Sequence, residues 1–371
     1  MPKVGTVEIL RMRLGMKRST SKAIAVDLGA SGLRAVQLDE TGQSIHAACE
    51  SPLHAGADRN DHHEATGKFI HELASDPRWN SRTLLLSMPS TLVTMMPVEL
   101  SAHDDPEAAV QARLADARDE LMVRHLDVTN PRRSNRGEKS LLCIAMPKAE
   151  VLRYVEMIHE HRLKVAGVYA PASLLIRAFR HIHRRMEDGD AASLYLNLDP
   201  TGITMAVGQG SQLVAARSSI GSCIPPSQRG SQKKHIRAHA CVTTDVGSEF
   251  MERRHGDQTP SYVDMPDDGS STQDCNLLLD EVRMCLRQYQ MAHSDRPVQR
   301  LIFTGPGASH IEFCRDVAQS LAMPAHFGDP MSQWEGPSEG MPRCDRTNHV
   351  RPQWSIVAGL IRESLELDDA A

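Results

Sequence analysis

Two turns that contain glycine, far apart in the chain, constrain its fold more than any other feature. The first lies within Ala25–Leu38, where an apolar strand reaches Asp27, turns through Gly29 and Gly32, and resumes as a second strand. Glycine allows such a turn and a close approach of another backbone. The second lies within Leu301–Ala308, where an apolar strand enters a Gly-Pro-Gly turn that leads into a helix. Together these turns predict a nucleotide-binding type of fold, in which the hairpin cradles phosphate and the late turn closes over the nucleoside.

The composition narrows the class of protein. At 371 residues, the chain can form two ordinary domains or one large bilobed domain. Its residues are 40% hydrophobic and 24% charged, which is typical of a globular protein with a sizeable core. Aromatic residues make up only 4%, and the net charge is −5, so nucleic acid is not expected as a partner. No apolar run reaches the roughly 18 residues of a membrane-spanning helix.

The first 21 residues form a basic leader that lacks the apolar core of a signal peptide. We expect this leader to be solvated or weakly amphipathic. A helix that docks on a membrane surface or on a partner is the alternative.

Neither cysteine nor histidine forms a metal-binding pattern. The eight cysteines contain no Cys-x-x-Cys pair, and several lie in apolar runs, so we expect buried thiols in a reducing cytoplasm. His62-His63-Glu64 and His181-Ile-His183 have no further ligand set beside them, which favours a structural or surface role.

The pattern of apolar residues divides the chain into three parts after the leader. Residues 22–83 form a first-lobe core. Residues 84–186 form an inserted β-α-β-α subdomain that returns to the first lobe, with a helix predicted over Pro106–Val123. Residues 187–371 form a second lobe. Residues 223–274 interrupt it with a polar stretch that we expect to be irregular.

The order of these segments resembles that of the PilM-type proteins of type IV pilus assembly, which are related to the FtsA division proteins. The resemblance implies a bilobed, actin-like α/β fold of the duplicated ribonuclease H-like type. It rests on Ile24–Leu38, on Leu84–Phe179 with its Met88-Pro89 and Ala166–Pro171 motifs, on Glu281–Tyr289 with Pro297–Ala308, and on Ala358–Arg362.

The chain departs from the family pattern at the second phosphate hairpin. That hairpin normally begins with Asp-x-Gly. In the register without a gap, Asn197 takes the place of the aspartate and Asp199 that of the glycine. A shifted register puts Asp199 at the aspartate position, with Gly202 behind it. In addition, Gly305-Pro-Gly307 replaces a glycine triplet.

The resemblance also implies a site for ATP and Mg²⁺. Asp27 and Asp199 would hold the metal through water. An asparagine at the second metal position cannot supply negative charge, so we expect at most weak hydrolysis. The implied nucleotide contacts are Asp27, Gly29, Ser31, Gly32 and Arg34 in the first hairpin, Asn197, Asp199, Thr201 and Gly202 in the second, and Glu281, Gly305, Gly307 and Ala308 on the adenosine side.

Two functions remain open at this point. One is a cytoplasmic scaffold, peripheral to the inner membrane, that captures the N-terminal peptide of an inner-membrane pilus or secretion protein and forms a homo-oligomer. The groove would then lie between the first hairpin and residues 84–179, with Leu86 and Val93 in its walls. The alternative is a small-molecule kinase of the sugar kinase, Hsp70 and actin superfamily, or an FtsA-like division protein.

Overall fold

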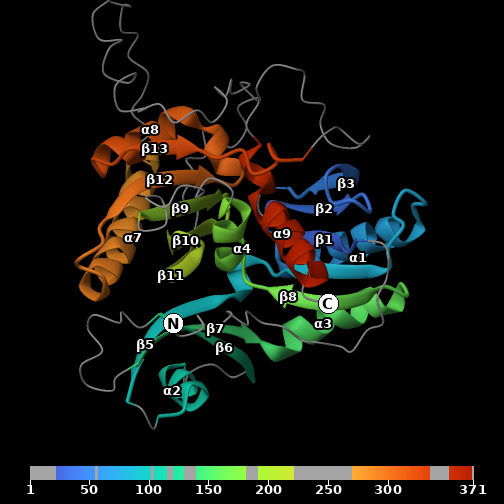
Figure 1. Ribbon diagram of the computed structural model, residues 1–371, viewed down its shortest axis with the longest axis horizontal. Coiled ribbons are helices and arrows are strands. Elements are labelled where there is room, and N and C mark those ends of the chain that lie inside the picture. Colours follow the sequence, from blue (N-terminus) through green and yellow to red (C-terminus); the bar gives the residue numbers. More distant parts are fainter. Residues whose placement is uncertain are drawn as a thin grey trace, which may run out of the picture.

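The computed structural model describes residues 22–54, 57–101, 104–114, 120–128, 139–180, 191–220, 270–334 and 351–369. The expected leader, nearly all of the polar stretch 223–274 and the pair His181 and His183 lie outside these ranges. The described part consists of two lobes side by side, with a smaller unit attached below them (Figure 1).

Each lobe is built on a mixed sheet of five strands. In the first lobe, the spatial order is β3 (Ile45–Pro52), β2 (Gly32–Leu38), β1 (Ile24–Gly29), β4 (Thr83–Ser87) and β8 (Lys164–Tyr169). In the second lobe, it is β11 (Gln212–Ile220), β10 (Gly202–Gln209), β9 (Ala192–Asp199), β12 (Val298–Thr304) and β13 (Ala325–Phe327).

The two lobes repeat one topology. In each, the first three strands are antiparallel, and the fourth and fifth are parallel to the first and reached through helices. The helices correspond in pairs: α1 (Arg59–Ser75) to α7 (Ser270–Ala292), α3 (Lys148–Glu160) to α8 (Ile311–Ser320), and α4 (Pro171–Ala178) to α9 (Ser355–Asp369). This repeat is the duplicated, bilobed α/β fold that the sequence predicted.

Helices α4 and α9 pack against each other between the two sheets (Figure 1). Gly359 makes this possible, because a β-carbon there would collide with the backbone of Leu174. Arg177 of α4 pairs with the buried Glu363 of α9 at 2.6 Å. The two lobes therefore share a tightly packed centre.

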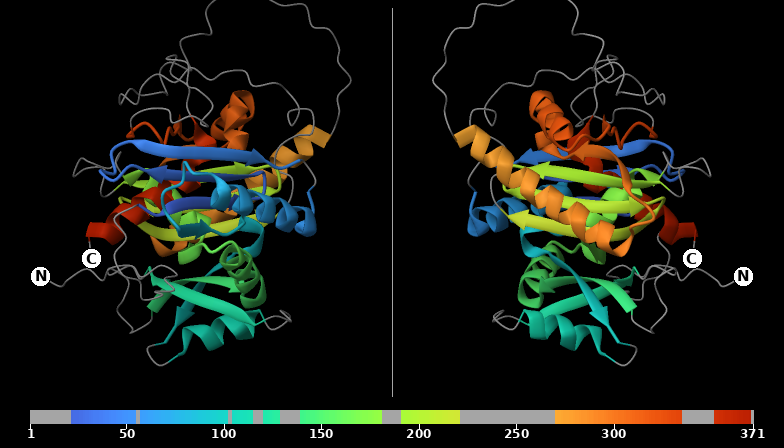
Figure 2. Two further views of the ribbon diagram at one scale, coloured as in Figure 1. Left: turned by 90° about the vertical axis from the view of Figure 1, so that its right-hand side faces the viewer. Right: turned by 90° about the vertical axis from the view of Figure 1, so that its left-hand side faces the viewer.

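The smaller unit has its own sheet and its own core. Its antiparallel strands lie in the order β5 (Thr94–Leu100), β7 (Lys139–Pro147) and β6 (Leu121–Asp127), with α2 (Pro106–Arg113) against them. This unit lies below both lobes (Figure 2). The Ser218 hydroxyl of β11 donates to the carbonyl of Val93 at 2.9 Å and ties the second lobe to the segment that leads into β5.

The inserted unit is narrower than residues 84–186. Strands β4 and β8 belong to the first-lobe sheet, so only the chain from β5 to β7 forms the separate sheet. The predicted helix over Pro106–Val123 is also wrong, because α2 ends at Arg113 and Leu121–Asp127 form β6. Pairing of β6 with β7 buries Val123 and Leu126, and this tertiary contact outweighs the helical spacing of the apolar residues.

Other expectations agree with the structure. The free cysteines Cys143, Cys285 and Cys314 are buried, as expected of small apolar residues. Across the described ranges, no helix is both long enough and apolar enough to cross a membrane.

Candidate functional site

Two hairpins, one from each lobe, turn toward the same place between the lobes. In the first, Gly29 pairs with Gly32 and Asp27 pairs with Arg34. In the second, Asp199 pairs with Gly202 and Asn197 pairs with Thr204. Matching the hairpins pair by pair aligns Asn197 with Asp27 and Asp199 with Gly29. Of the two registers left open by the sequence, the one without a gap therefore fits the repeat of the fold.

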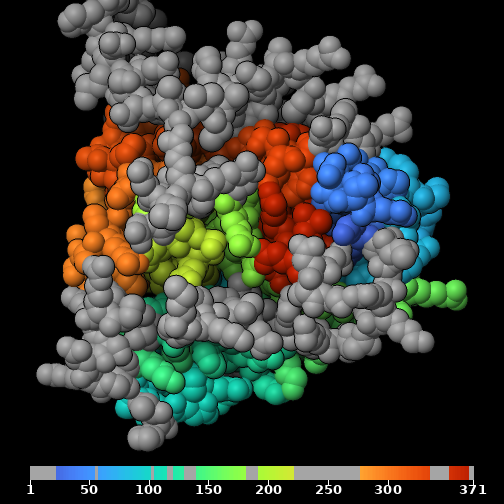
Figure 3. Space-filling view, viewed as in Figure 1, coloured from blue at the N-terminus to red at the C-terminus, as the bar shows by residue number. Residues whose placement is uncertain are grey.

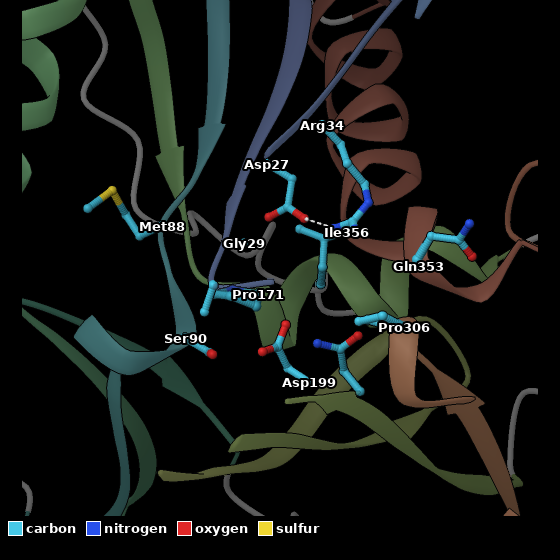
Figure 4. Close-up of a pocket in the computed structure, with 12 residues that line it drawn as sticks. Asp27, Gly29, Arg34, Met88, Ser90, Pro171, Asp199, Pro306, Gln353 and Ile356 are labelled. Atoms are coloured by element: carbon cyan, nitrogen blue, oxygen red, sulfur yellow. Dashed lines mark ion pairs between the residues drawn. The ribbon is translucent and has the colours of Figure 1, made fainter. Parts of the chain in front are cut away.

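A narrow cavity of about 20 Å³ lies between the two hairpins. The first hairpin contributes Asp27, Gly29, Ala30 and Arg34, and the second contributes Asn197 and Asp199 (Figure 4). Pro306 comes from the late glycine turn, and the remaining lining residues are Met88, Ser90, Pro171, Gln353 and Ile356. This volume holds about one water molecule or one ion, not a nucleoside triphosphate.

Asp27 lies at the centre of the electrostatics of this cavity. Its side chain is buried, and this burial raises its pKa to about 7, although the positive charge of Arg34 acts in the opposite direction. Arg34 lies 3.7 Å from Asp27, but its Nε donates to Glu50 at the shorter distance of 2.9 Å. Arg34 therefore neutralises Asp27 only in part, and the negative charge of Asp199 raises the pKa further.

The oxygen atoms around the cavity suit a hard divalent cation. Two carboxylates, Asp27 and Asp199, line it, and Mg²⁺ prefers such ligands in proteins. Asn197 also lines the cavity, but its side-chain oxygen accepts from the Thr304 hydroxyl at 3.3 Å. One oxygen of Asp199 is already engaged, because it accepts from the backbone N–H of Thr201 at 3.1 Å and from its hydroxyl at 2.8 Å. The donor set thus fits Mg²⁺, whereas the space fits a nucleotide only if the lobes move apart.

The structure brings together five of the predicted site residues, namely Asp27, Gly29, Arg34, Asn197 and Asp199. The others do not line the cavity: Ser31, Gly32, Thr201, Gly202, Glu281, Gly307 and Ala308, while Gly305 stands just before the lining residue Pro306. Ser31 retains one sign of a binding role, because its hydroxyl oxygen is buried and has no hydrogen-bond partner.

Glu281 forms a bond within the second lobe. Its carboxylate accepts from Nε of Arg217 in β11 at 2.8 Å, which holds α7 on the edge of the sheet. This geometry shows a structural ion pair and gives no support for contact of Glu281 with a nucleoside.

Gly305 has a conformation that favours glycine, with φ of 80°. A β-carbon there would lie 2.5 Å from the carbonyl oxygen of Leu198 and 2.7 Å from the side-chain oxygen of Asn197. Its N–H donates to the carbonyl of Pro352 at 2.9 Å. The late turn therefore approaches the second hairpin closely and places Pro306 at the cavity.

Sequence reasoning missed several residues that line the cavity. Met88 is the clearest case. It directly follows β4 in the first lobe, and Gly305 directly follows β12, the equivalent strand of the second lobe. Pro171 begins α4, and Ile356 lies in the first turn of α9, the corresponding helix. An internal comparison of the two lobes could have found these positions. For Gln353, we see no signal in the sequence.

Behind the first hairpin, a buried histidine connects the turn to two helices. His62 of α1 lies with Nε2 3.4 Å from the carbonyl oxygen of Gly29 and with Nδ1 3.0 Å from the hydroxyl of Tyr154 in α3. Burial lowers the pKa of His62, which favours the neutral ring. The ring of His63 stacks on Tyr154, with 4.6 Å between the ring centroids, and its Nε2 lies 3.1 Å from a carboxylate oxygen of Glu150. These contacts agree with the structural role predicted for His62 and His63.

No protein-family model and no curated protein matches the chain. Among solved structures, it is similar to the PilM-PilN type IV pilus biogenesis complex, with a TM-score of 0.68 and 15% identity over 94% of this chain and 99% of that chain. A Bacteroides thetaiotaomicron protein with an actin-like ATPase fold gives a TM-score of 0.45 at 12% identity, over 86% of this chain and 96% of that one. MreB 5 of Spiroplasma citri bound to AMPPNP gives 0.43 at 11% identity, over 95% and 99%. The chain therefore has the two-lobed α/β fold found in the PilM-PilN structure.

Proposed function

We propose that this chain is an actin-like scaffold that captures a short N-terminal peptide of an inner-membrane protein in a pilus or secretion assembly. The observation that carries the proposal is the fold similarity to the PilM-PilN complex, which extends over nearly the whole of both chains. In this proposal, the protein is cytoplasmic and reaches the inner membrane through its partner.

The candidate nucleotide site supports a scaffold better than an enzyme. Asn197 stands where the fold repeat calls for a counterpart of Asp27, so the second hairpin has no carboxylate at that position to help hold Mg²⁺ and a polarised water, and its one acidic side chain at the cavity is Asp199, two residues further on. Arg34 is engaged with Glu50, and the cavity is too small for a nucleotide. ATP with Mg²⁺ would bind only after the lobes open, and hydrolysis would be weak or absent.

The junction between the first lobe and the inserted unit is the proposed place of peptide capture. Helix α3 lies along this junction, because it packs on α1 and β8 on one side and on β7 on the other. Its apolar residues Val151, Tyr154 and Ile158 are buried, while Leu152 is 38% exposed. An extended peptide with apolar side chains could cover Leu152. In this general mode of peptide recognition, alternate side chains of the bound strand fill pockets on the protein.

Leu86 and Val93 are not suitable as groove residues. Leu86 is fully buried in the first-lobe sheet, and Val93 is 4% exposed. An aspartate at either position would place a charge in the core and unfold the protein rather than report on binding. Leu152 offers a surface position for the same test.

The proposal is tested by pull-down with the full chain from a detergent-solubilised inner-membrane fraction. The N-terminal cytoplasmic segment of the captured protein is then made as a labelled peptide and titrated by fluorescence anisotropy. We expect saturable binding that changes little with salt, because the contact is mainly apolar. Leu152→Glu should weaken binding about tenfold or more, while the control Gln319→Glu, exposed on α8 of the second lobe, should not. Equal binding by both variants would contradict this location, and capture of no inner-membrane protein would contradict the function.

A further inference from the structure

Helix α7 carries a line of exposed apolar side chains on its outer face. Five large hydrophobic side chains are exposed in the described residues, and three of them lie on α7: Leu277 at 61%, Met284 at 42% and Met291 at 73%. The opposite face of the helix, with Leu278, Val282, Cys285 and Tyr289, is buried on the second-lobe sheet. The helix lies across the outer face of that sheet (Figure 2), and it reaches the surface at the left edge of the molecule (Figure 3).

The spacing of this line is that of a helix-pairing seam. Leu277, Met284 and Met291 recur every seven residues, which is the heptad repeat that keeps one stripe of a helix facing a partner helix. Two exposed charged residues, Asp280 and Arg287, stand between them on the same stripe, and Asp280 also pairs with Arg283 of its own helix at 3.4 Å. The seam is therefore Leu277, Asp280, Met284, Arg287 and Met291, with apolar and charged positions in alternation.

We propose that this seam is a surface for self-association, in which the α7 helices of two copies pair antiparallel about a twofold axis near Met284. Methionine side chains are flexible and adapt well to such contacts. The proposal does not depend on peptide capture, because α7 belongs to the second lobe and the capture site to the junction below the first.

The charges on the seam indicate that its partner is the α7 helix of a second copy and that the two helices run antiparallel. In an antiparallel pair centred on Met284, Leu277 faces Met291 of the second copy, and Asp280 comes next to Arg287 of the second copy. In a parallel pair, each charge would instead face its own counterpart, which is unfavourable. The pattern is thus self-complementary in one orientation only, as a twofold interface requires.

The size of the seam predicts a weak dimer. From Leu277 to Met291, the helix rises about 21 Å. A contact of that length between two helices falls below the roughly 1,200 Å² of a stable interface, so association should depend on protein concentration.

The experiment is sedimentation velocity on the full chain over a concentration range of about 1 µM to 1 mM. We expect the weight-average sedimentation coefficient to rise with concentration, from that of a monomer toward that of a dimer. Met284→Glu should raise the dissociation constant about tenfold or more, because it puts two like charges at the axis. The matched control, Gln290→Glu, adds the same charge at an exposed position off the seam and should leave the dimer unchanged.

Charge reversal separates this interface from a folding defect. Asp280→Arg and Arg287→Asp should each weaken the dimer, because each variant places like charges side by side, and the double reversal should restore it to within about twofold. A protein that stays monomeric at every concentration would show that something other than a second copy covers the seam, and this would overturn the proposal. A dimer that is insensitive to Met284→Glu and to both single reversals would overturn it as well.

Discussion

Replacing Asp27 by asparagine should change how stability depends on pH. Asp27 has a pKa of about 7 in the folded protein, mainly because it is buried, against 3.8 for the free side chain. The folded state therefore holds this proton more tightly than the unfolded state does. The contribution of Asp27 to the free energy of unfolding is fully present below about pH 4 and is lost as the pH rises through 7. Above pH 4, the unfolded chain releases this proton, whereas the folded protein must keep it or bury a charge.

The size of the effect follows from the two pKa values. Each pKa unit between the folded and unfolded states corresponds to about 1.4 kcal/mol. The ionisable side chain of Asp27 therefore lowers the free energy of unfolding by up to about 4 kcal/mol above pH 7. Between pH 5 and pH 8, the cost grows by about 3 kcal/mol. Asparagine has the same shape and no charge, so Asp27→Asn should gain about this much stability relative to the wild type over that interval.

Urea unfolding of both proteins at pH 5, 6, 7 and 8 measures the difference directly. Asp316→Asn, which removes an exposed carboxyl of α8, serves as the control for a surface substitution. If the difference between Asp27→Asn and the wild type stays constant from pH 5 to pH 8, Asp27 is not the buried, proton-retaining group described here. If the wild type gains stability relative to the variant as the pH rises, the carboxylate is well paired and the reasoning fails.

Four further predictions concern the late turn, the nucleotide, the polar stretch and the leader. Gly305→Ala should lower the free energy of unfolding by about 1–3 kcal/mol, since its φ is positive and the β-carbon meets the Leu198 carbonyl; urea unfolding checks this, and an unchanged midpoint would contradict it. Mg-ATP titrated by calorimetry should bind weakly or not at all, and phosphate release should stay well below about 1 per second; faster turnover that Asp27→Asn abolishes would refute the scaffold proposal. Limited proteolysis should cut first within 223–274, and deletion of Met1–Thr20 should leave peptide capture intact; protection of that stretch, or loss of capture, would count against these two expectations.

Local sequence was a good guide to the hairpins and a poor guide to the inserted unit. The first hairpin could be predicted because apolar strands flank its glycines, and a turn depends mainly on nearby residues. Strand β6 could not be predicted, because Leu121–Asp127 become a strand only through pairing with β7. Strands β4 and β8 likewise join the first-lobe sheet through contacts between segments distant in sequence.

The site shows the same division. The residue types at Asp27, Arg34, Asn197 and Asp199 could be recognised from the sequence, because each stands at a strand end or in a turn. The partners could not be predicted, because Arg34 reaches Glu50 across β2 and β3 and Glu281 reaches Arg217 across a helix and a strand. The nucleoside contact expected of Gly305 stays a prediction, and its close approach to the backbone of Leu198 could not be foreseen from the sequence.

The sequence by itself determined that the chain carries two strand-turn-strand hairpins with glycine in their turns, far apart along the chain, and that asparagine and aspartate both stand near the second turn. These features depend on composition and on residues close together in the chain. Only the tertiary structure decided the register of the second hairpin, the small size of the cavity and the raised pKa of Asp27. Those properties arise where the two lobes meet, and burial and charge there are set by residues that are far apart along the chain.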